Sequence, residues 1–213
     1  MCSDNLVEKP DLQEELNKAL RLMDKKWQKQ DTREDERSRF IYSTDSVDEC
    51  IEKANRYGID VNYVLHRWYN HKTSDMCEQL LVKYGAIKEQ NLGHKEIDVY
   101  IKNIPYDVKL SVFPRALNRD EFDLDNKEDR NRLIQWFYTN QSNSGRRHFE
   151  NRLFIVCDGD DQYDNMKLKG DIELLDEEIR KYMAYKTYNP NKLIIETDTD
   201  DMEVYSDIIV IHK

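Results

Sequence analysis

Apolar residues recur at helical spacing near the start of the chain. Pro10 and Asp11 open this segment, and apolar residues then follow at intervals of three and four from Leu12 to Trp27. Residues 28–39 are almost wholly polar, so the helix either continues as a solvated rod or frays there. The apolar stripe is wide, which favours a helix that packs on a core over a dimerisation or partner helix.

Helical patterns continue up to residue 85. The segment that begins at Ser46 has capping-box spacing, and Gly58 is a natural C-terminal stop for it. A short helix is expected over 60–69 and a separate one over 74–84. The first half of the chain is therefore predicted to be helical.

The pattern then changes to alternation with a period of two, which is typical of strands. It predicts strands over 96–101 and 106–112, joined by a turn centred on Asn103 and Ile104. An apolar run over 153–157 predicts a buried strand. The remaining expected elements are strands at 86–88, 193–195 and 208–211 and helices at 127–139 and 170–185.

Helices that flank a short mixed sheet predict an α/β fold. We expect residues 1–45 to form an N-terminal helix and polar tether, and residues 46–213 to form the α/β domain. A homodimer through the N-terminal helix is the alternative use of its apolar stripe.

Composition narrows the class of protein. The formal net charge of -10 excludes a uniformly basic surface for nucleic acid, but not a local basic cleft or a metal that screens phosphates. No apolar run approaches the ~18–20 residues of a membrane span, and the first residues lack the pattern of a secretory signal. Four dispersed cysteines without a CxxC pair indicate a reduced protein and exclude a cysteine-based zinc site. We therefore expect a cytoplasmic protein with no membrane partner.

The two alternating strands bring acidic and basic side chains together. With the expected turn, Tyr100 faces Asp107 and Asp98 faces Lys109, so two acids and a lysine gather on one face of the hairpin. Two carboxylates can hold Mg²⁺ (or Mn²⁺), which keeps waters for a substrate and lowers their pKa. A lysine beside the ion can orient the attacking water or stabilise developing negative charge. The hairpin therefore predicts hydrolysis of phosphodiester bonds.

Asp98, followed on the next strand by Asp107-Val108-Lys109 as a D-x-K element, resembles the PD-(D/E)XK nuclease superfamily. The resemblance covers roughly residues 60–160. It implies a restriction-endonuclease-like core of order αβββαβ with an N-terminal helical extension. It also implies Mg²⁺-dependent cleavage of nucleic acid, DNA more than RNA, in restriction, defence or repair.

In that superfamily the helix before the first strand often supplies a further acid, and Glu78 fits that place. The resemblance thus implies Asp98, Asp107 and Glu78 as metal ligands and Lys109 as a catalytic residue. Two features depart from the pattern. Ile97 stands where the family name has proline, and the run 135–138 is one residue short of the QxxxY pattern of RecB-like exonucleases.

Some basic residues cluster locally despite the acidic total. Arg115 follows the D-x-K strand, and Arg146 and Arg147 lie in a polar loop that Arg152 flanks. Arginine can grip phosphates bidentately, so Arg115, Arg146 and Arg147 are the candidates for substrate binding. The alternative, weighted equally, is that these charges balance acidic neighbours.

Other functions stay open beside the nuclease. The chain could be a catalytically inactive nuclease fold, or an unrelated α+β protein that acts as a binding or assembly module. His94 precedes the hairpin and is a further residue that could reach the site. The acidic run 158–161 predicts a turn at a strand end rather than a Ca²⁺ loop.

Overall fold

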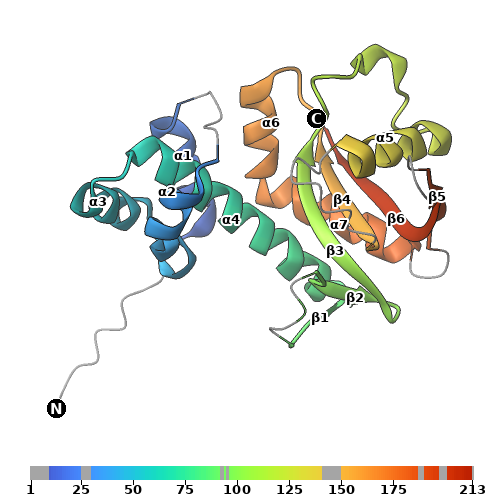
Figure 1. Ribbon diagram of the computed structural model, residues 1–213, viewed down its shortest axis with the longest axis horizontal. Coiled ribbons are helices and arrows are strands. Elements are labelled where there is room, and N and C mark those ends of the chain that lie inside the picture. Colours follow the sequence, from blue (N-terminus) through green and yellow to red (C-terminus); the bar gives the residue numbers. More distant parts are fainter. Residues whose placement is uncertain are drawn as a thin grey trace. The chain divides into compact units, whose positions relative to one another are not determined.

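A computed structural model describes most of the chain, namely residues 10–24, 30–91, 94, 96–140, 150–186, 190–196 and 201–212. The chain divides into two compact units, residues 1–73 and residues 74–213 (Figure 1). The expected boundary was after residue 45. The first unit extends further because the helix that follows residue 45 packs with the N-terminal one: the Glu15 carboxylate accepts the Val47 N–H at 2.5 Å.

The first unit is helical in its described part. Its elements are α1 (Leu12–Leu22), α2 (Thr32–Arg37), the 3-10 helix η1 (Arg39–Ser43), α3 (Val47–Tyr57) and the first part of α4 (Val61–Lys83). Leu16, Ala19 and Leu20 of α1 are buried, so the described part of the stripe packs on a core, as the sequence favoured. The polar stretch does not prolong this helix, because Asp31 caps α2 as a separate one.

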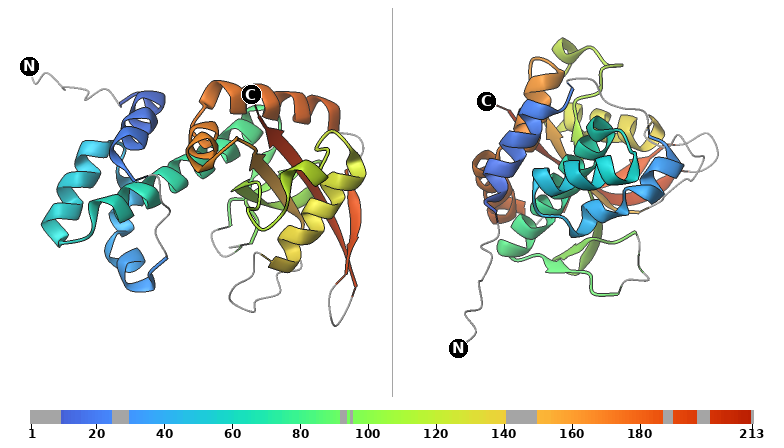
Figure 2. Two further views of the ribbon diagram at one scale, coloured as in Figure 1. Left: turned by 90° about the horizontal axis from the view of Figure 1, so that it is seen from above. Right: turned by 90° about the vertical axis from the view of Figure 1, so that its left-hand side faces the viewer.

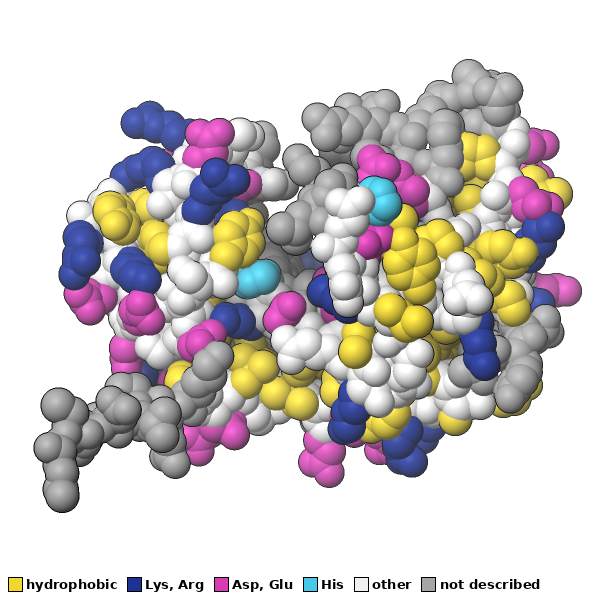
Figure 3. Space-filling view, turned by 90° about the horizontal axis from the view of Figure 1, so that it is seen from below, with side chains coloured by type: hydrophobic (Ala, Val, Ile, Leu, Met, Phe, Trp, Pro, Cys, Tyr) yellow, Lys and Arg dark blue, Asp and Glu magenta, His cyan; other side chains and the backbone are white. Residues whose placement is uncertain are grey.

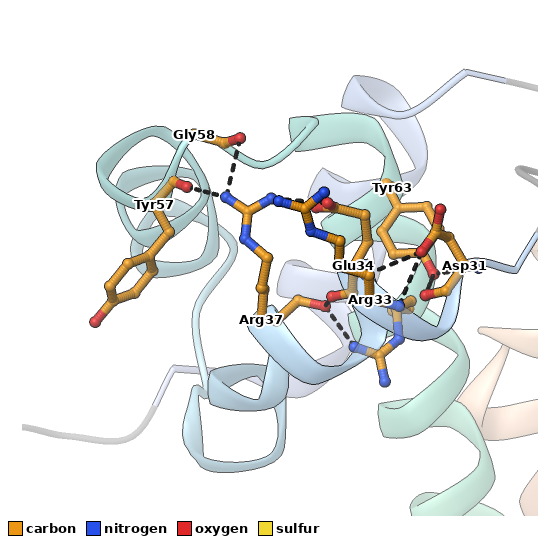
Figure 4. Close-up of polar contacts among 9 residues, drawn as sticks. Asp31, Arg33, Glu34, Arg37, Tyr57, Gly58 and Tyr63 are labelled. Atoms are coloured by element: carbon orange, nitrogen blue, oxygen red, sulfur yellow. Dashed lines mark hydrogen bonds and ion pairs between the residues drawn. The ribbon is translucent and has the colours of Figure 1, made fainter.

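Polar contacts hold α2 against the end of α3 (Figure 4). The Arg37 guanidinium donates to the Glu34 carboxylate at 2.7 Å and to the backbone carbonyls of Tyr57 and Gly58, where α3 ends. Carbonyls at a helix C-terminus lack partners within the helix, so Arg37 satisfies groups that would otherwise need water. Gly58 adopts φ 61°, the left-handed conformation of a C-terminal stop.

Helix α4 is one continuous helix of 23 residues, where two separate helices were expected. Residues 70–73, which lie between the two expected helices, include neither glycine nor proline, so no residue there ends the helix. The Thr73 hydroxyl donates to the Tyr69 carbonyl at 2.9 Å, so this polar side chain is satisfied within the helix. None of the described helices is both long and apolar enough to cross a membrane.

The second unit contains a six-stranded mixed sheet of order β1-β2-β3-β4-β6-β5. The first three strands are antiparallel, β3, β4 and β6 are parallel, and β5 is antiparallel to β6. This confirms an α/β fold with a mixed sheet. The elements are β1 (Ile87–Lys88), β2 (Val99–Ile101), β3 (Ile104–Val112), the 3-10 helix η2 (Arg119–Glu121), α5 (Lys127–Asn140), β4 (Arg152–Cys157), α6 (Gln162–Lys169), α7 (Ile172–Lys186), β5 (Lys192–Ile195) and β6 (Met202–Ile211).

Helices cover both faces of this sheet. Figure 2 shows α5 on one face and α7 on the other. On the α5 side, Phe137 stacks on Phe154 of β4 with ring centroids 4.7 Å apart, in a core that includes Leu133 and Ile208. The three cysteines of the described chain, Cys50, Cys77 and Cys157, are buried free thiols.

The β2–β3 hairpin turns one residue earlier than expected. Its turn residues are Lys102 and Asn103, with φ of 51° and 66°. A two-residue type I′ turn requires positive φ at both positions. Ile104 is β-branched and disfavours positive φ, which explains why the turn does not centre on it.

The earlier turn shifts the pairing of the two strands by two residues. Val99 pairs with Tyr106 and Tyr100 with Pro105, so the expected facing pairs, Tyr100 with Asp107 and Asp98 with Lys109, are wrong. A shift by two residues leaves the alternation of faces intact, whereas a shift by one would exchange them. The carboxylates therefore stay neighbours, in a different arrangement.

Candidate active site

Asp98, the residue before β2, lies beside Asp107 of β3. The Asp98 N–H donates to the Tyr106 carbonyl at 2.9 Å, and Asp98 Oδ2 accepts the Val108 N–H at 2.7 Å. Asp98 thus binds the backbone of β3 on both sides of Asp107. Bonds to a strand backbone hold a side chain in a defined place, as a catalytic group requires.

Asp107 is a buried acid, 7% exposed, between two cations. Lys109 Nζ donates to its Oδ1, and Nε of Arg152 lies 3.5 Å from its Oδ2. Burial raises the pKa of Asp107; Lys109 opposes this rise, and the charge of Asp98 adds to it. The carboxylate is therefore less well stabilised here than in water, despite its two partners. A divalent cation bound to this carboxylate would stabilise its ionised form.

Glu78, on α4, contacts Lys88 of β1, which donates to its carboxylate. Burial raises the pKa of Glu78, the bond from Lys88 opposes the rise, and Asp98 adds to it. Glu78 is thus close enough to Asp98 to feel its charge. Its carboxylate, however, is held by a lysine.

The donor set fits Mg²⁺ or Mn²⁺ through two carboxylates. No three Asp, Glu, His or Cys side chains within the described ranges converge closely enough to hold an ion together. Mg²⁺ takes few protein oxygens and keeps several waters, so the carboxylates of Asp98 and Asp107 are enough protein ligands for it. Glu78 is not required as a third ligand in this arrangement.

Arg152 is a site residue whose role the sequence did not reveal. It opens β4 in register with Asp107, is 8% exposed, and places its guanidinium 5.1 Å from the centroid of the Tyr138 ring of α5. In the sequence it only flanks the polar loop that contains Arg146 and Arg147. The available signal was a charged residue at the start of a wholly buried apolar strand, because such a charge needs a partner.

The candidates for substrate binding do not gather at this site. Arg115 lies beyond the carboxyl end of β3, where it donates to Gln162 of α6. Roughly 16 Å of strand separates Asp107 from that end, at about 3.3 Å per residue. Arg146 and Arg147 fall outside the described residues. On the face drawn in Figure 3, the coloured Lys and Arg side chains are interspersed with Asp and Glu.

A cavity of about 690 Å³ lies at the carboxyl ends of the parallel strands, and Arg115 is one of its lining residues. Arg119 Nε donates there to both carboxylate oxygens of Asp158, at 2.9 and 2.8 Å. The acidic run 158–161 forms the expected connection at the end of β4, and Asp161 caps α6. Asp158, at this end of the sheet, is therefore held in a structural ion pair with Arg119.

No family model, curated protein or solved structure matches this chain. The interpretation of the site therefore depends on the residues themselves and on their geometry. The contacts around Asp98, Asp107 and Lys109 are the observations from which a function can be argued.

Proposed function

We propose that the second unit is a divalent-metal-dependent nuclease that hydrolyses phosphodiester bonds of nucleic acid, with DNA favoured by the superfamily resemblance. The observation that carries the proposal is the pair of bonds by which Asp98 holds the backbone on both sides of Asp107, beside Lys109. Restriction, defence and repair are the settings that such an activity suits.

The order of elements supports a restriction-endonuclease-like core. From α4 to β4 the chain runs helix, strand, strand, strand, helix, strand. The first three strands are antiparallel and β4 is parallel to β3. This order agrees with the αβββαβ order that the resemblance implies, and it supports the proposal together with the position of Asp98 just before β2 and of Asp107 in β3.

In this proposal Asp98 and Asp107 hold Mg²⁺ or Mn²⁺. The bound ion would supply an activated water and neutralise negative charge on the phosphate. Lys109 orients that water or stabilises charge that develops on the phosphate. Arg152 helps to hold the Asp107 carboxylate in place through their ion pair. Glu78 acts through its charge rather than as a direct ligand, because Lys88 holds it.

A second candidate is a catalytically inactive nuclease fold that serves as a binding or assembly module. The lysine contacts favour it, since Lys109 bonds Asp107 and Lys88 bonds Glu78, so two of the three acids have a cation without any metal. The two candidates differ in whether a divalent ion binds and whether a phosphodiester bond is cut.

The test is incubation of the full chain with plasmid, linear duplex DNA, single-stranded DNA and RNA, with Mg²⁺, Mn²⁺ or chelator. We expect cleavage only with metal. Asp107→Asn should lower the rate by about 1,000-fold, because an ion at this position contributes several kcal/mol to transition-state stabilisation. Asp160→Asn is the matched control, an exposed aspartate in the connection after β4, and should cleave at the wild-type rate.

Thermal unfolding with metal separates the two candidates. An ion that binds the folded state at 100 times its Kd adds about 2.7 kcal/mol to the free energy of unfolding. No cleavage of any substrate, together with no rise in Tm, would contradict the nuclease and favour the binding module. A rise in Tm without cleavage would leave a metal-binding protein that is not a nuclease.

A further inference from the structure

The strand β5 forms one edge of the sheet in the second unit. It pairs with β6, and no other described strand adjoins it (Figure 1). An edge strand presents backbone N–H and C=O groups to which another extended chain can bond. The contacts of β5 show which of its residues present such groups.

The backbone groups of β5 alternate between the two sides of the strand. The Ser206 N–H of β6 donates to the Asn191 carbonyl at 3.0 Å, so the groups of residues 191, 193 and 195 point towards β6. Those of residues 192, 194 and 196 therefore point away from the sheet. Between described residues, no hydrogen bond satisfies the outward groups of Lys192 and Ile194.

Glu196 shows what these outward groups bind. The Gln135 side chain of α5 donates from Nε2 to the Glu196 carbonyl at 2.7 Å, and its Oε1 accepts the Glu196 N–H at 3.2 Å. An amide that donates and accepts at one residue reproduces the pair of bonds that an adjoining strand makes. Gln135 thus closes the edge at Glu196 and leaves it open at Lys192 and Ile194.

The side chains at the open part of the edge permit contact with a further strand. Ile194 is 64% exposed. A free lysine on an edge strand discourages pairing, but Lys192 Nζ lies 2.7 Å from a carboxylate oxygen of Glu203 on β6. The charge of Lys192 is therefore balanced within its own sheet.

One antiparallel register lets two copies of β5 pair through these groups, since outward residues must face outward residues. If Lys192 faced the partner's Lys192, like charges would lie opposite one another, which is destabilising. Any register that uses Glu196 would require the Gln135 side chain to leave. Lys192 facing the partner's Ile194 avoids both conflicts, and it places Leu193 opposite the partner's Leu193 on a two-fold axis.

A groove of about 630 Å³ beside the edge adds apolar surface to this contact. Trp136 of α5 and Leu193 of β5 line it, and both are partly buried against the core on the α5 side of the sheet. In the register above, the partner's Leu193 lies on this same side, next to Leu193. The edge therefore fits an extended chain with an apolar side chain between two outward-facing residues, which a second β5 supplies.

We propose that the chain forms a two-fold symmetric dimer through β5, in which the two six-stranded sheets join into one. The N–H and C=O of Lys192 bond those of the partner's Ile194, and the same bonds recur from Ile194 to the partner's Lys192. Such a contact is isologous, so it closes at two copies. The dimer is independent of the proposed nuclease, because β4 and β6 separate β5 from the strand that carries Asp107.

Sedimentation equilibrium of the full chain tests the dimer. The wild type should show twice the 25.7 kDa mass of one chain and dissociate on dilution. Ile194→Lys places a lysine opposite the partner's Lys192 at two positions, so the Kd of the dimer should rise at least about 10-fold. Within its own sheet residue 194 faces Glu203, so the fold should be kept, as checked by far-ultraviolet circular dichroism.

Ile87→Lys is the matched control for this charge. Ile87 is 61% exposed and lies on β1, the strand at the opposite edge of the same sheet. This variant should dimerise with the wild-type Kd. An equal loss of dimer in Ile87→Lys and Ile194→Lys would overturn the proposal, because added charge alone would then explain the effect.

Cysteine cross-linking tests the register. Opposite residues of a non-hydrogen-bonded pair have Cα atoms about 4.5 Å apart, within the range of a disulfide. Leu193→Cys, in a Cys2→Ser background, should therefore give a disulfide-linked dimer under mild oxidation. Ile194→Cys should not, because the two copies of residue 194 lie two positions out of register, with Cα atoms more than about 7 Å apart.

Each outcome supports or overturns this contact. A dimer that Ile194→Lys weakens and Leu193→Cys links supports it. A dimer that Ile194→Lys leaves intact, or that Leu193→Cys does not link, uses another surface or register and overturns it. A wild type that stays a single chain at every concentration also overturns it and leaves the edge to an unrelated extended chain. Loss or absence of cleavage has no bearing on these results, so the failure of the nuclease and of the dimer are distinguishable.

Discussion

The two ends of the parallel strands in the second unit each carry an aspartate beside basic side chains, but the contacts of the two aspartates differ. At the carboxyl end, Asp158 accepts two bonds from the Arg119 guanidinium, and that arginine also donates to the Phe122 carbonyl at 2.5 Å. Near the start of β3, Asp107 is buried between Lys109 and Arg152 and still has a raised pKa. At one end an aspartate and an arginine form a structural pair, while at the other a buried aspartate keeps a raised pKa in spite of two neighbouring cations.

This contrast shows where to look for chemistry in a charged protein. Ion pairs are common on this chain, so an aspartate beside an arginine or lysine has little meaning by itself. A carboxylate that stays unfavourable when ionised, in spite of its partners, lowers stability. Such groups persist where a ligand or reaction uses them, which is why perturbed acids gather at functional sites.

The largest effect on stability is expected for Asp158, at the carboxyl ends of the parallel strands. Asp158→Ala leaves Arg119 without its bidentate partner, and bonds to charged groups are each worth about 1.5–3 kcal/mol. We expect a loss of about 2 kcal/mol in the free energy of unfolding, measured by urea denaturation. Asp160→Ala, an exposed acid in the same connection, should change it by less than about 0.5 kcal/mol. Equal effects of the two substitutions would contradict a stabilising role of the Asp158–Arg119 ion pair.

A gain in stability, not a loss, is expected from a substitution of Asp107. Asp107→Asn should raise the free energy of unfolding at pH 7 by about 1 kcal/mol, within the range typical of relieved functional sites. The reason is that burial raises the pKa of Asp107, so its ionised form is disfavoured in the folded state. A neutral amide of the same shape avoids that cost, and its oxygen can still accept a hydrogen bond from Lys109 or Arg152.

The pH dependence of this difference provides its control. The folded pKa of Asp107 is above the ordinary 3.8, so its favourable contribution is full below that value and is lost as pH rises through the folded pKa. The advantage of Asp107→Asn should therefore vanish near pH 3.8 and be complete above the folded pKa. Destabilisation by Asp107→Asn at pH 7 would show that Asp107 is a structural acid like Asp158.

The sequence predicted the side chains of the site better than their contacts. Strict alternation placed Asp98, Asp107 and Lys109 close together, and a register shift of two residues preserved that placement. The pairing itself depends on which residues tolerate positive φ, so Ile104 was the clue that the turn had to centre on Lys102 and Asn103.

Partners from distant segments could not be predicted in the same way. Arg152 reaches Asp107 because β3 and β4 pair in parallel with a specific register, which no local pattern encodes. The continuity of α4 was missed for a related reason, since its apolar residues serve two different units and do not form one stripe. Local rules predicted elements and faces, while long-range pairing determined the contacts.

The smallest effect is expected for Glu78→Gln. Relief of a buried carboxylate and loss of the bond from Lys88 oppose each other, so the free energy of unfolding should change by less than about 0.5 kcal/mol. The rise in Tm with Mg²⁺ should also persist, because Asp98 and Asp107 are the proposed ligands, whereas Asp98→Asn should abolish it. If Glu78→Gln abolishes the rise as completely as Asp98→Asn does, Lys88 releases Glu78 when metal binds. Three carboxylates would then hold the ion, and Glu78 would be the third metal ligand that the resemblance implies.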